Sequence, residues 1–516
     1  MAVGPNVPTR EQIQEIAEDF GLSLSGATIE AYQAIMGAVF NHYRTIDELI
    51  EPKLEVKYPR TPGYRPEPED NPYNGWYWKT DIKGASKGIL KGKTIALKDN
   101  ICLAGVPMMN GSRVLEGFVP DVDATVVTRI LDAGGTIAGK ATCEDLCFSG
   151  GGHTCALGPV RNPRKPSHSP GASSNGSGVL VANGDVDMAL GGDQGGSIRI
   201  PAAWCGTYGL KATHGLVPYT GIIPIEMTLD HCGPMTRSME DLARLLTAIA
   251  GVDGLDPRQP ANVKPKDYMA ALEGDVKGLK IAVLKEGFGQ KPRDDIGLPG
   301  SDPATDRKVK AALKLLERRG ATLTEVSVPM HAQGVALWNA IIIEGSTECM
   351  IKGNTLGSNW QGYYNTQAAD IYARGWRSRP NDFSDTVKVV ALIGEYMNRN
   401  YHSRYYHKAQ NIRRVLRAKY EAVLASYDLI AFPAVTFRAT PLPAPDCTPG
   451  EYFAAALNMI GNTVQFDVSG HPVASIPCGM EDGLPIGLGL CGRFFDEPTI
   501  IRAGATFEKI GDWTKM

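Results

Sequence analysis

The sequence predicts an α/β fold in which a β-sheet carries helices on both faces. Short apolar runs, typical of buried strands, alternate with helical segments along most of the chain. The chain has 516 residues, which is enough for a large hydrophobic core and more than one structural unit. Because strands connected through helices need helical cover on both sides, the alternation favours a sheet between helical layers.

The first 65 residues are predicted to form a helical segment and a linker. Residues 8–50 carry apolar side chains three and four residues apart, which indicates two or three amphipathic helices. The stretch that follows, EPKLEVKYPRTPGYRPEPEDNPYNGW, contains too much proline for a regular helix and predicts a connector. We therefore expect residues 1–65 to be a packing or dimerisation arm, and residues 66–516 to be the main body.

The main body starts with a predicted strand, GKTIALKDN, and continues as an alternation of strands and helices. The other predicted strands are TIAGKA, VDMALGGD, LKIAVLKE, TLTEVSV, YDLIAFPA and LPIGLGLCGR. The predicted helices include ATVVTRILDAGG, which ends in glycine, SIRIPAAWCG, and SMEDLARLLTAIAG, which has a serine cap and an acidic first turn.

Composition excludes several classes of partner. Hydrophobic residues make up 43% of the chain and charged residues 21%, and the net charge is -3. This balance gives no sign of binding to nucleic acid or to an anionic membrane. The N-terminus, MAVGPNVPTREQ, has no apolar signal-peptide core, and no run of eighteen apolar residues occurs. We expect a cytoplasmic protein whose ten cysteines are reduced thiols.

The stretch GGDQGGSIRIP presents a serine, Ser197, just before a predicted helix. Proline is tolerated only in the first helical turn, so Pro201 places Ser197 at the positive end of that helix, where anions bind. An acyl-transfer reaction creates such an anion, the tetrahedral oxyanion. Alone, the stretch also fits a glycine-rich turn, but it lacks the glycine spacing of nucleotide-binding loops. Candidate oxyanion donors are the N–H groups of Gln194, Gly195, Gly196 and Ser197.

Two upstream stretches add the other groups that a reactive serine needs. Lys98 ends the strand IALKDN, and Ser173 lies in the serine- and glycine-rich segment SPGASSNGSG. Together with Ser197 they offer a nucleophile, a hydroxyl relay and an amine base. Burial disfavours the ammonium form, which is how lysine becomes a usable base.

With these three motifs in hand, the sequence resembles the amidase-signature family of serine hydrolases. ALKDN, PGASSNGS and GGDQGGSIRIP occur in the family's order, and VPMMNGSR, CEDLCFSG, GLVPYTG and FDVSGHP are similar to segments of bacterial enantioselective amidases. The resemblance implies the amidase-signature fold, a mixed twisted sheet covered by helices on both faces, with an N-terminal helical segment. Residues 66–516 would then be the catalytic domain.

The resemblance also implies a reaction and residue roles. Ser197 would be the nucleophile, Ser173 the bridging hydroxyl after a cis peptide bond, and Lys98 the base. Gln194 and its neighbours would form the oxyanion hole. The enzyme would hydrolyse carboxamides of aromatic or branched aliphatic acids to carboxylate and ammonia, without metal or organic cofactor, as a homodimer. Supporting roles in the loops fall to Ser174, Asp193 and Arg199, the last two through charge-assisted hydrogen bonds.

Phe148, Trp338 and Ile460 match positions that line the acyl pocket in the similar amidases, although each could equally be a core residue. If they line the pocket, it is hydrophobic. Cys143, Cys147, His153 and Cys155 match no common zinc spacing, so we expect buried thiols there. His214 and His231 are expected to be structural or to line the pocket.

Three alternatives remain open from the sequence. The same triad could attack anilides, carbamates (urethanes) or esters. The glutaminase subunit of a transfer-RNA-dependent amidotransferase shares the motifs, although the N-terminal helices argue against it. A catalytically dead binding protein is the third. Two departures from the family pattern also matter: Ala172 and Asn175 replace glycines, which raises the question of whether the loop keeps its geometry.

Overall fold

The computed structural model describes residues 5–354 and 362–516 and divides the chain into two compact units, Met1–Leu54 and Glu55–Met516. The sequence placed the end of the first unit eleven residues later, at residue 65. The stretch between belongs to the larger unit because Lys57 and Tyr58 both bind the carboxylate of Asp132.

The described part of the smaller unit, residues 5–54, contains two helices, α1 (Arg10–Asp19) and α2 (Gly26–Glu48). Thr9 starts α1 with a capping box that Gln12 completes, and Ser25 caps α2. The apolar spacing that predicted these helices buries few side chains within the unit itself. Apolar side chains of α2 that stay exposed include Ile35, Val39, Tyr43 and Ile46.

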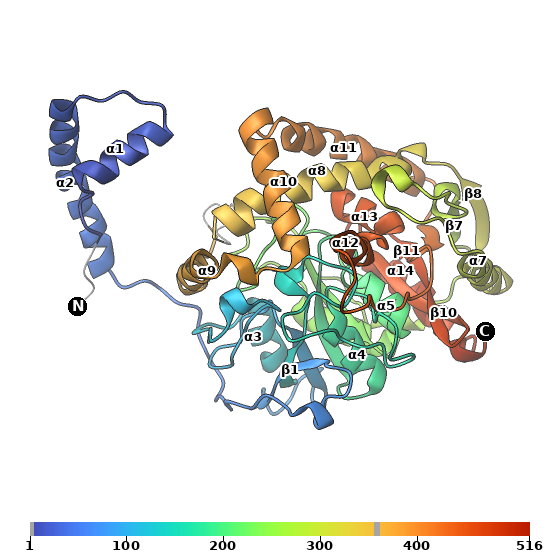
Figure 1. The fold of residues 1–516 in the computed structure, drawn as a ribbon. Coiled ribbons are helices and arrows are strands. Elements are labelled where there is room, and N and C mark those ends of the chain that lie inside the picture. The colour runs from blue at the N-terminus through green and yellow to red at the C-terminus, as the bar shows by residue number, and fades with distance from the viewer. Residues whose placement is uncertain (1–4, 355–361) are drawn as a thin grey trace. The chain divides into compact units, whose positions relative to one another are not determined.

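The larger unit is built on one mixed sheet of eleven strands in the order β1-β3-β2-β4-β6-β5-β10-β11-β9-β7-β8 (Figure 1). Its strands are β1 (Trp76–Lys83), β2 (Thr94–Lys98), β3 (Thr136–Ala141), β4 (Met188–Asp193), β5 (Tyr208–Lys211), β6 (His231–Thr236), β7 (Lys280–Leu284), β8 (Thr322–Val326), β9 (Leu429–Pro433), β10 (Val473–Glu481) and β11 (Leu484–Cys491). β2 runs parallel to β3 and β4, β7 runs parallel to β8 and β9, and the remaining pairs are antiparallel. The predicted α/β class and mixed sheet are confirmed.

Helices cover both faces of this sheet, as the sequence predicted. Met188 and Leu190 of β4 belong to the large core that α3 and α6 also fill, whereas Ala189, on the opposite face, packs with Leu180 of α4. The helices of this unit are α3 (Thr125–Asp132), α4 (Asn175–Asn183), α5 (Arg199–Cys205), α6 (Met239–Ile249), α7 (Pro303–Arg318), α8 (Gly334–Ser346), α9 (Thr366–Ser378), α10 (Asp385–Tyr401), α11 (Arg404–Leu424), α12 (Pro449–Leu457), α13 (Val464–Ser469) and α14 (Glu497–Glu508).

Two adjacent strands in the middle of this architecture set the position of the site. β2 and β4 are paired and parallel, so their carboxyl ends, Lys98 and Asp193, emerge at the same edge of the sheet. Ligands bind at this edge in open α/β sheets. The two motifs that the sequence singled out are thereby brought together.

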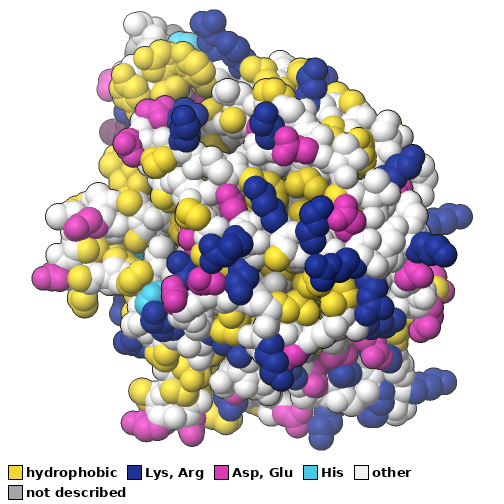
Figure 2. Space-filling model, turned by 90° about the vertical axis from the view of Figure 1, so that its right-hand side faces the viewer, with side chains coloured by type: hydrophobic (Ala, Val, Ile, Leu, Met, Phe, Trp, Pro, Cys, Tyr) yellow, Lys and Arg dark blue, Asp and Glu magenta, His cyan; other side chains and the backbone are white. Residues whose placement is uncertain are grey.

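Figure 2 shows Lys and Arg side chains spread over one face of the molecule, with acidic side chains between them. In the part of the chain that the structure describes, no helix combines the length and apolar character that crossing a membrane requires.

Candidate active site

Lys98 and Ser173 form a buried amine–hydroxyl pair. Both side chains are fully buried, and Lys98 Nζ lies 2.8 Å from Ser173 Oγ and 3.2 Å from the carbonyl oxygen of Gly192. Lys98 closes β2, and Ser173 lies just ahead of α4 after a cis peptide bond from Ala172, as the resemblance implied. The pair has the geometry needed to pass a proton.

Ser197 lies in the loop between β4 and α5, and its side chain reaches a cavity. The residue is 8% exposed. Its loop is tied to the Ser173 segment because the Ser174 N–H donates to the Ser197 carbonyl at 3.2 Å. Ser174 Oγ also binds both the N–H and the carbonyl of Gly192. The two motifs therefore share one framework, with Ser174 in the supporting position that the sequence assigned to it.

Asp193 anchors the loop that carries Ser197, here called the nucleophile loop, on the side opposite the cavity. Its carboxylate accepts the N–H of Gly196 at 2.6 Å and of Ile198 at 3.1 Å, together with two hydrogen bonds from Arg199, at 2.9 Å each. Burial opposes ionisation of Asp193, but the charge and hydrogen bonds of Arg199 outweigh it and lower the pKa of the carboxyl. The loop is thus anchored by an ion pair that water cannot reach.

One of the four backbone N–H groups that were expected to bind the oxyanion already has a partner in the structure. The N–H of Gly196 is taken by Asp193, so it is not free to bind an oxyanion. Among the described residues, the N–H groups of Gln194, Gly195 and Ser197 have no protein acceptor. A row of unpartnered backbone donors at the start of a helix stabilises a developing negative charge.

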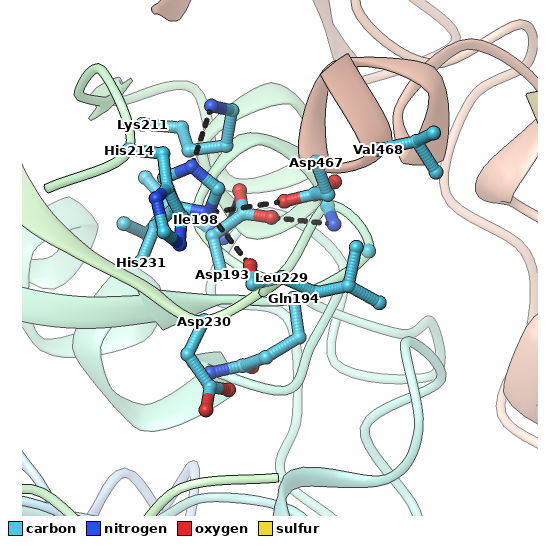
Figure 3. Close-up of polar contacts among 12 residues, drawn as sticks. Asp193, Gln194, Ile198, Lys211, His214, Leu229, Asp230, His231, Asp467 and Val468 are labelled. Atoms are coloured by element: carbon cyan, nitrogen blue, oxygen red, sulfur yellow. Dashed lines mark hydrogen bonds and ion pairs between the residues drawn. The ribbon is translucent and has the colours of Figure 1, made fainter. Parts of the chain in front are cut away.

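A second layer of buried charge lies behind Asp193, and the sequence analysis did not identify it. Figure 3 shows Lys211, His231 and Asp467 gathered around Asp193. Arg199 donates to Asp467 at 2.6 Å, and Lys211 Nζ lies 3.2 Å from His231 Nε2. Burial lowers the pKa of Lys211 to about 8 and keeps His231 neutral by lowering its pKa far below the usual value.

Asp467 has a pKa well above the usual value, because it is fully buried and faces the charge of Asp193. Asp467 lies on α13, 268 residues beyond Arg199. No local sequence signal pointed to it. The only hint was its place in FDVSGHP, one of the segments similar to the enantioselective amidases.

The three predicted pocket residues, Phe148, Trp338 and Ile460, lie in the wall of one cavity with Ser197. Other apolar wall residues are Cys147, Ile200, Ile225, Ile342 and Leu457. The free volume is about 30 Å³, close to the share of one water molecule, whereas a 150 Å³ cavity admits benzene. The enclosed part of the cavity is therefore small in the structure.

Ala172 and Asn175, which replace family glycines, are both accommodated. Ala172 is fully buried next to Ser173. Asn175 begins α4, and its side-chain amide donates to Glu144 at 2.8 Å. Asn175 is helical, so this position does not need the left-handed backbone that favours glycine.

Cys147 is buried, as expected, and it also lines the cavity next to Phe148. Cys143 and Cys155 are buried, as expected. Over residues 5–354 and 362–516, no three His, Cys, Asp or Glu side chains are grouped to hold a metal ion. His214 binds the Met227 carbonyl at 3.1 Å, and neither it nor His231 lines the cavity.

Comparison with known proteins identifies the family to which this chain belongs. A family model described as Amidase matches residues 77–501. The chain is 42% identical over 510 residues to an enantioselective amidase of Rhodococcus rhodochrous, covering 98% of this chain and 96% of that one. It is 40% identical over 422 residues to a glutamyl-tRNA(Gln) amidotransferase component of Exiguobacterium sibiricum, covering 81% and 84%.

Similar solved structures also belong to amidases. A peptide amidase from Stenotrophomonas maltophilia is 29% identical with a TM-score of 0.65, and the match covers 82% of this chain and 83% of that one. A bacterial aryl acylamidase of the amidase-signature family is 25% identical with a TM-score of 0.67, covering 83% and 84%. The chain therefore belongs to the amidase family and is an amide-hydrolysing enzyme.

Proposed function

We propose that this enzyme hydrolyses carboxamides with an aromatic or branched aliphatic acyl group to a carboxylate and ammonia, through an acyl-enzyme on Ser197. The observation that carries the proposal is the buried Lys98 amine, 2.8 Å from Ser173 Oγ. It lies beside a loop with backbone N–H groups that have no protein acceptor among the described residues. An amine, a relay hydroxyl and a nucleophilic serine are the groups that acyl transfer needs.

The reaction follows from these positions. The Lys98 amine takes the proton of Ser173 as Ser173 takes the proton of Ser197, and Ser197 Oγ bonds to the amide carbon. The carbonyl oxygen becomes an oxyanion that the free N–H groups of the loop stabilise. The C–N bond then breaks, and the proton returns through Ser173 to the departing ammonia. A water molecule repeats the sequence on the ester and releases the carboxylate.

The second link of this relay is not made in the structure. No hydrogen bond joins Ser173 Oγ to Ser197 Oγ within the described residues, although the two loops are connected through Ser174. Catalytic hydrogen bonds are often long without substrate and tighten in the Michaelis complex. We expect a rotation of the Ser197 side chain to close the gap.

The cavity favours an apolar acid over glutamine as the source of the acyl group. Its wall offers the apolar side chains of Phe148, Trp338 and Ile460, and none of its lining residues is charged. Glutamine carries an ammonium and a carboxylate, and burying them without partners is costly. This argues against the glutaminase alternative that the amidotransferase relatives raise.

A substrate panel tests the proposal directly. Purified enzyme is assayed on benzamide, isobutyramide, glutamine, an anilide, a carbamate and an ester, and kcat/KM is compared. We expect the two carboxamides to be hydrolysed far better than glutamine. Preference for the anilide, carbamate or ester would keep the site but contradict the proposed substrate class.

A covalent probe tests the role of the serine. A fluorophosphonate should label the wild-type enzyme and fail to label Ser197→Ala. Labelling that persists in the variant would place the nucleophile elsewhere.

We also propose that the enzyme is a homodimer. The support is the row of apolar side chains on α2, including Ile35, Val39 and Ile46, which the smaller unit by itself leaves exposed. Light scattering after size exclusion should give twice the chain mass. A monomer at micromolar concentration would contradict this.

A further inference from the structure

Two consecutive carbonyl groups of the nucleophile loop are held by side chains from distant parts of the chain. The indole Nε1–H of Trp338, on α8, donates to the Gln194 carbonyl at 2.7 Å. The hydroxyl of Thr463, just before α13, donates to the Gly195 carbonyl at 2.6 Å. Each bond fixes one end of a peptide unit of the loop.

A peptide unit is planar and trans, so its N–H points away from its C=O. The unit between Gly195 and Gly196 is held at both ends, by Thr463 on the carbonyl and by Asp193 on the N–H. The preceding unit is held only at its carbonyl, by Trp338. Its N–H, which belongs to Gly195, has no protein acceptor among the described residues.

From this asymmetry we infer that Trp338 is a positioning residue of the reaction. By binding the Gln194 carbonyl, its indole N–H aims the Gly195 N–H at the place where the oxyanion forms. The inference rests on the proposed acyl-transfer function and deepens it. Trp338 thus has a second role besides forming the cavity wall that contains Ser197.

The indole ring and its N–H can be separated experimentally. The ring packs closely on Gly195, because a Cβ built there would lie 2.8 Å from the ring carbon Cζ2. The ring also lines the cavity that contains Ser197, so it acts on the acyl group in the substrate and in the transition state alike. The N–H acts through Gly195 on the oxyanion, which exists only after attack, so its loss should lower kcat and leave KM unchanged.

The decisive variant replaces Trp338 by β-(3-benzothienyl)alanine, introduced site-specifically, which keeps the bicyclic shape and puts sulfur in place of the N–H. Trp338→Phe is a simpler second variant. For each, kcat and KM on benzamide are measured, together with the Ki of benzeneboronic acid, which forms a tetrahedral adduct on serine, and the Ki of benzoate, which does not.

We expect the benzothienyl variant to lose about tenfold or more in kcat, less than the 10²–10³ for deleting a donor outright. KM should stay within about twofold, the boronate should weaken by the same factor as kcat, and benzoate should not change. Equal weakening of boronate and benzoate, or an unchanged kcat, would overturn the inference and leave Trp338 as wall only.

Ile342→Val is the matched control, because Ile342 lies one turn further along α8 and lines the same cavity without binding the loop. It should change KM and both Ki values together. If wild-type enzyme failed to hydrolyse any amide, the proposed function would be contradicted, whereas the boronate and benzoate comparison would still decide the role of Trp338.

Discussion

The two sides of the nucleophile loop differ in how well their polar groups are partnered. The side toward the cavity is apolar and leaves the N–H groups of Gln194, Gly195 and Ser197 without protein acceptors among the described residues. The opposite side is charged, and Asp193 alone accepts four hydrogen bonds there from two backbone N–H groups and Arg199.

This difference shows how a loop can keep unmet donors in place. Unpartnered buried N–H groups are costly, and a loop free to move would turn them toward an acceptor. The ion pair between Asp193 and Arg199 removes that freedom from behind, so the front of the loop stays prepared for an oxyanion. Preorganised donors of this kind are worth more than donors that must reorient during the reaction.

The largest expected effect comes from removing Lys98 or Ser173, the two groups proposed to take the proton of Ser197. Lys98→Ala and Ser173→Ala should each lower kcat/KM by about 10³-fold or more, because the proton of Ser197 then has no route to a base. Steady-state kinetics on benzamide measures the loss, and circular dichroism confirms that the variants fold.

Ser174→Ala is the matched control for this prediction. Ser174 neighbours Ser173, but among the described residues its hydroxyl binds only Gly192, so its loss should cost about tenfold or less. Near-normal turnover in either relay variant would remove that residue from the mechanism.

The back side should show its effect mainly in stability. Arg199→Met leaves Asp193 and Asp467 buried without their shared cation, which should lower the free energy of unfolding by about 3–5 kcal/mol. Urea denaturation measures the loss. Arg374→Met, which breaks an exposed ion pair with Asp370, should cost at most about 1 kcal/mol. Similar losses in both variants would mean that the buried pair does not anchor the loop.

The sequence predicted the front of the loop better than the back. Ser197, Ser173 and Lys98 lie in short motifs, and the physical reason for each lies within a few residues of it. The back depends on long-range contacts: Thr463 and Asp467 reach the loop from more than 260 residues away. Residue spacing carries no information about such contacts.

The same limit applies to the fold. Apolar runs such as TIALK and LIAFP predicted β2 and β9 correctly. β1, β5, β6 and β10 were not predicted. Two of these strands, β6 (HCGPMT) and β10 (VASIPCGME), contain Pro234 and Pro477, which cannot donate to a ladder. Tertiary burial overrides the local preference at both prolines.

Through Lys211, the charged side of the loop should make the stability of the protein depend on pH. Burial lowers its pKa to about 8 in the folded protein, compared with about 10.4 unfolded. Between these values the unfolded chain binds more protons at this lysine, so the contribution of Lys211 to the free energy of unfolding rises with pH, by up to about 3 kcal/mol. Buried thiols whose pKa burial raises, such as Cys102 and Cys205, contribute the opposite slope, so the contribution of Lys211 is the difference between wild type and Lys211→Met in urea denaturation from pH 8 to 10.

Lys314→Met is the control, because Lys314 is exposed on α7 and should leave the pH dependence unchanged. If wild type and Lys211→Met showed the same dependence of the free energy of unfolding on pH, this lysine would stay charged in the folded protein. Its charge would then be fully compensated by Asp193 and Asp467.

The smallest expected effect concerns the shape of the cavity. Ile460→Ala removes three carbons from the wall of the Ser197 cavity, which has a free volume of about 30 Å³. The ratio of kcat/KM for benzamide to that for isobutyramide should rise by about tenfold, since a methylene in a hydrophobic pocket is worth about 10-fold or more. Ile476→Ala, in the core of β10, should lower stability and leave the ratio unchanged. If both variants shifted the ratio equally, a general loss of rigidity would explain the shift. The selectivity of the cavity would then depend on the rigid anchoring of the loop by Asp193 and Arg199 and not on the side chains of the cavity wall.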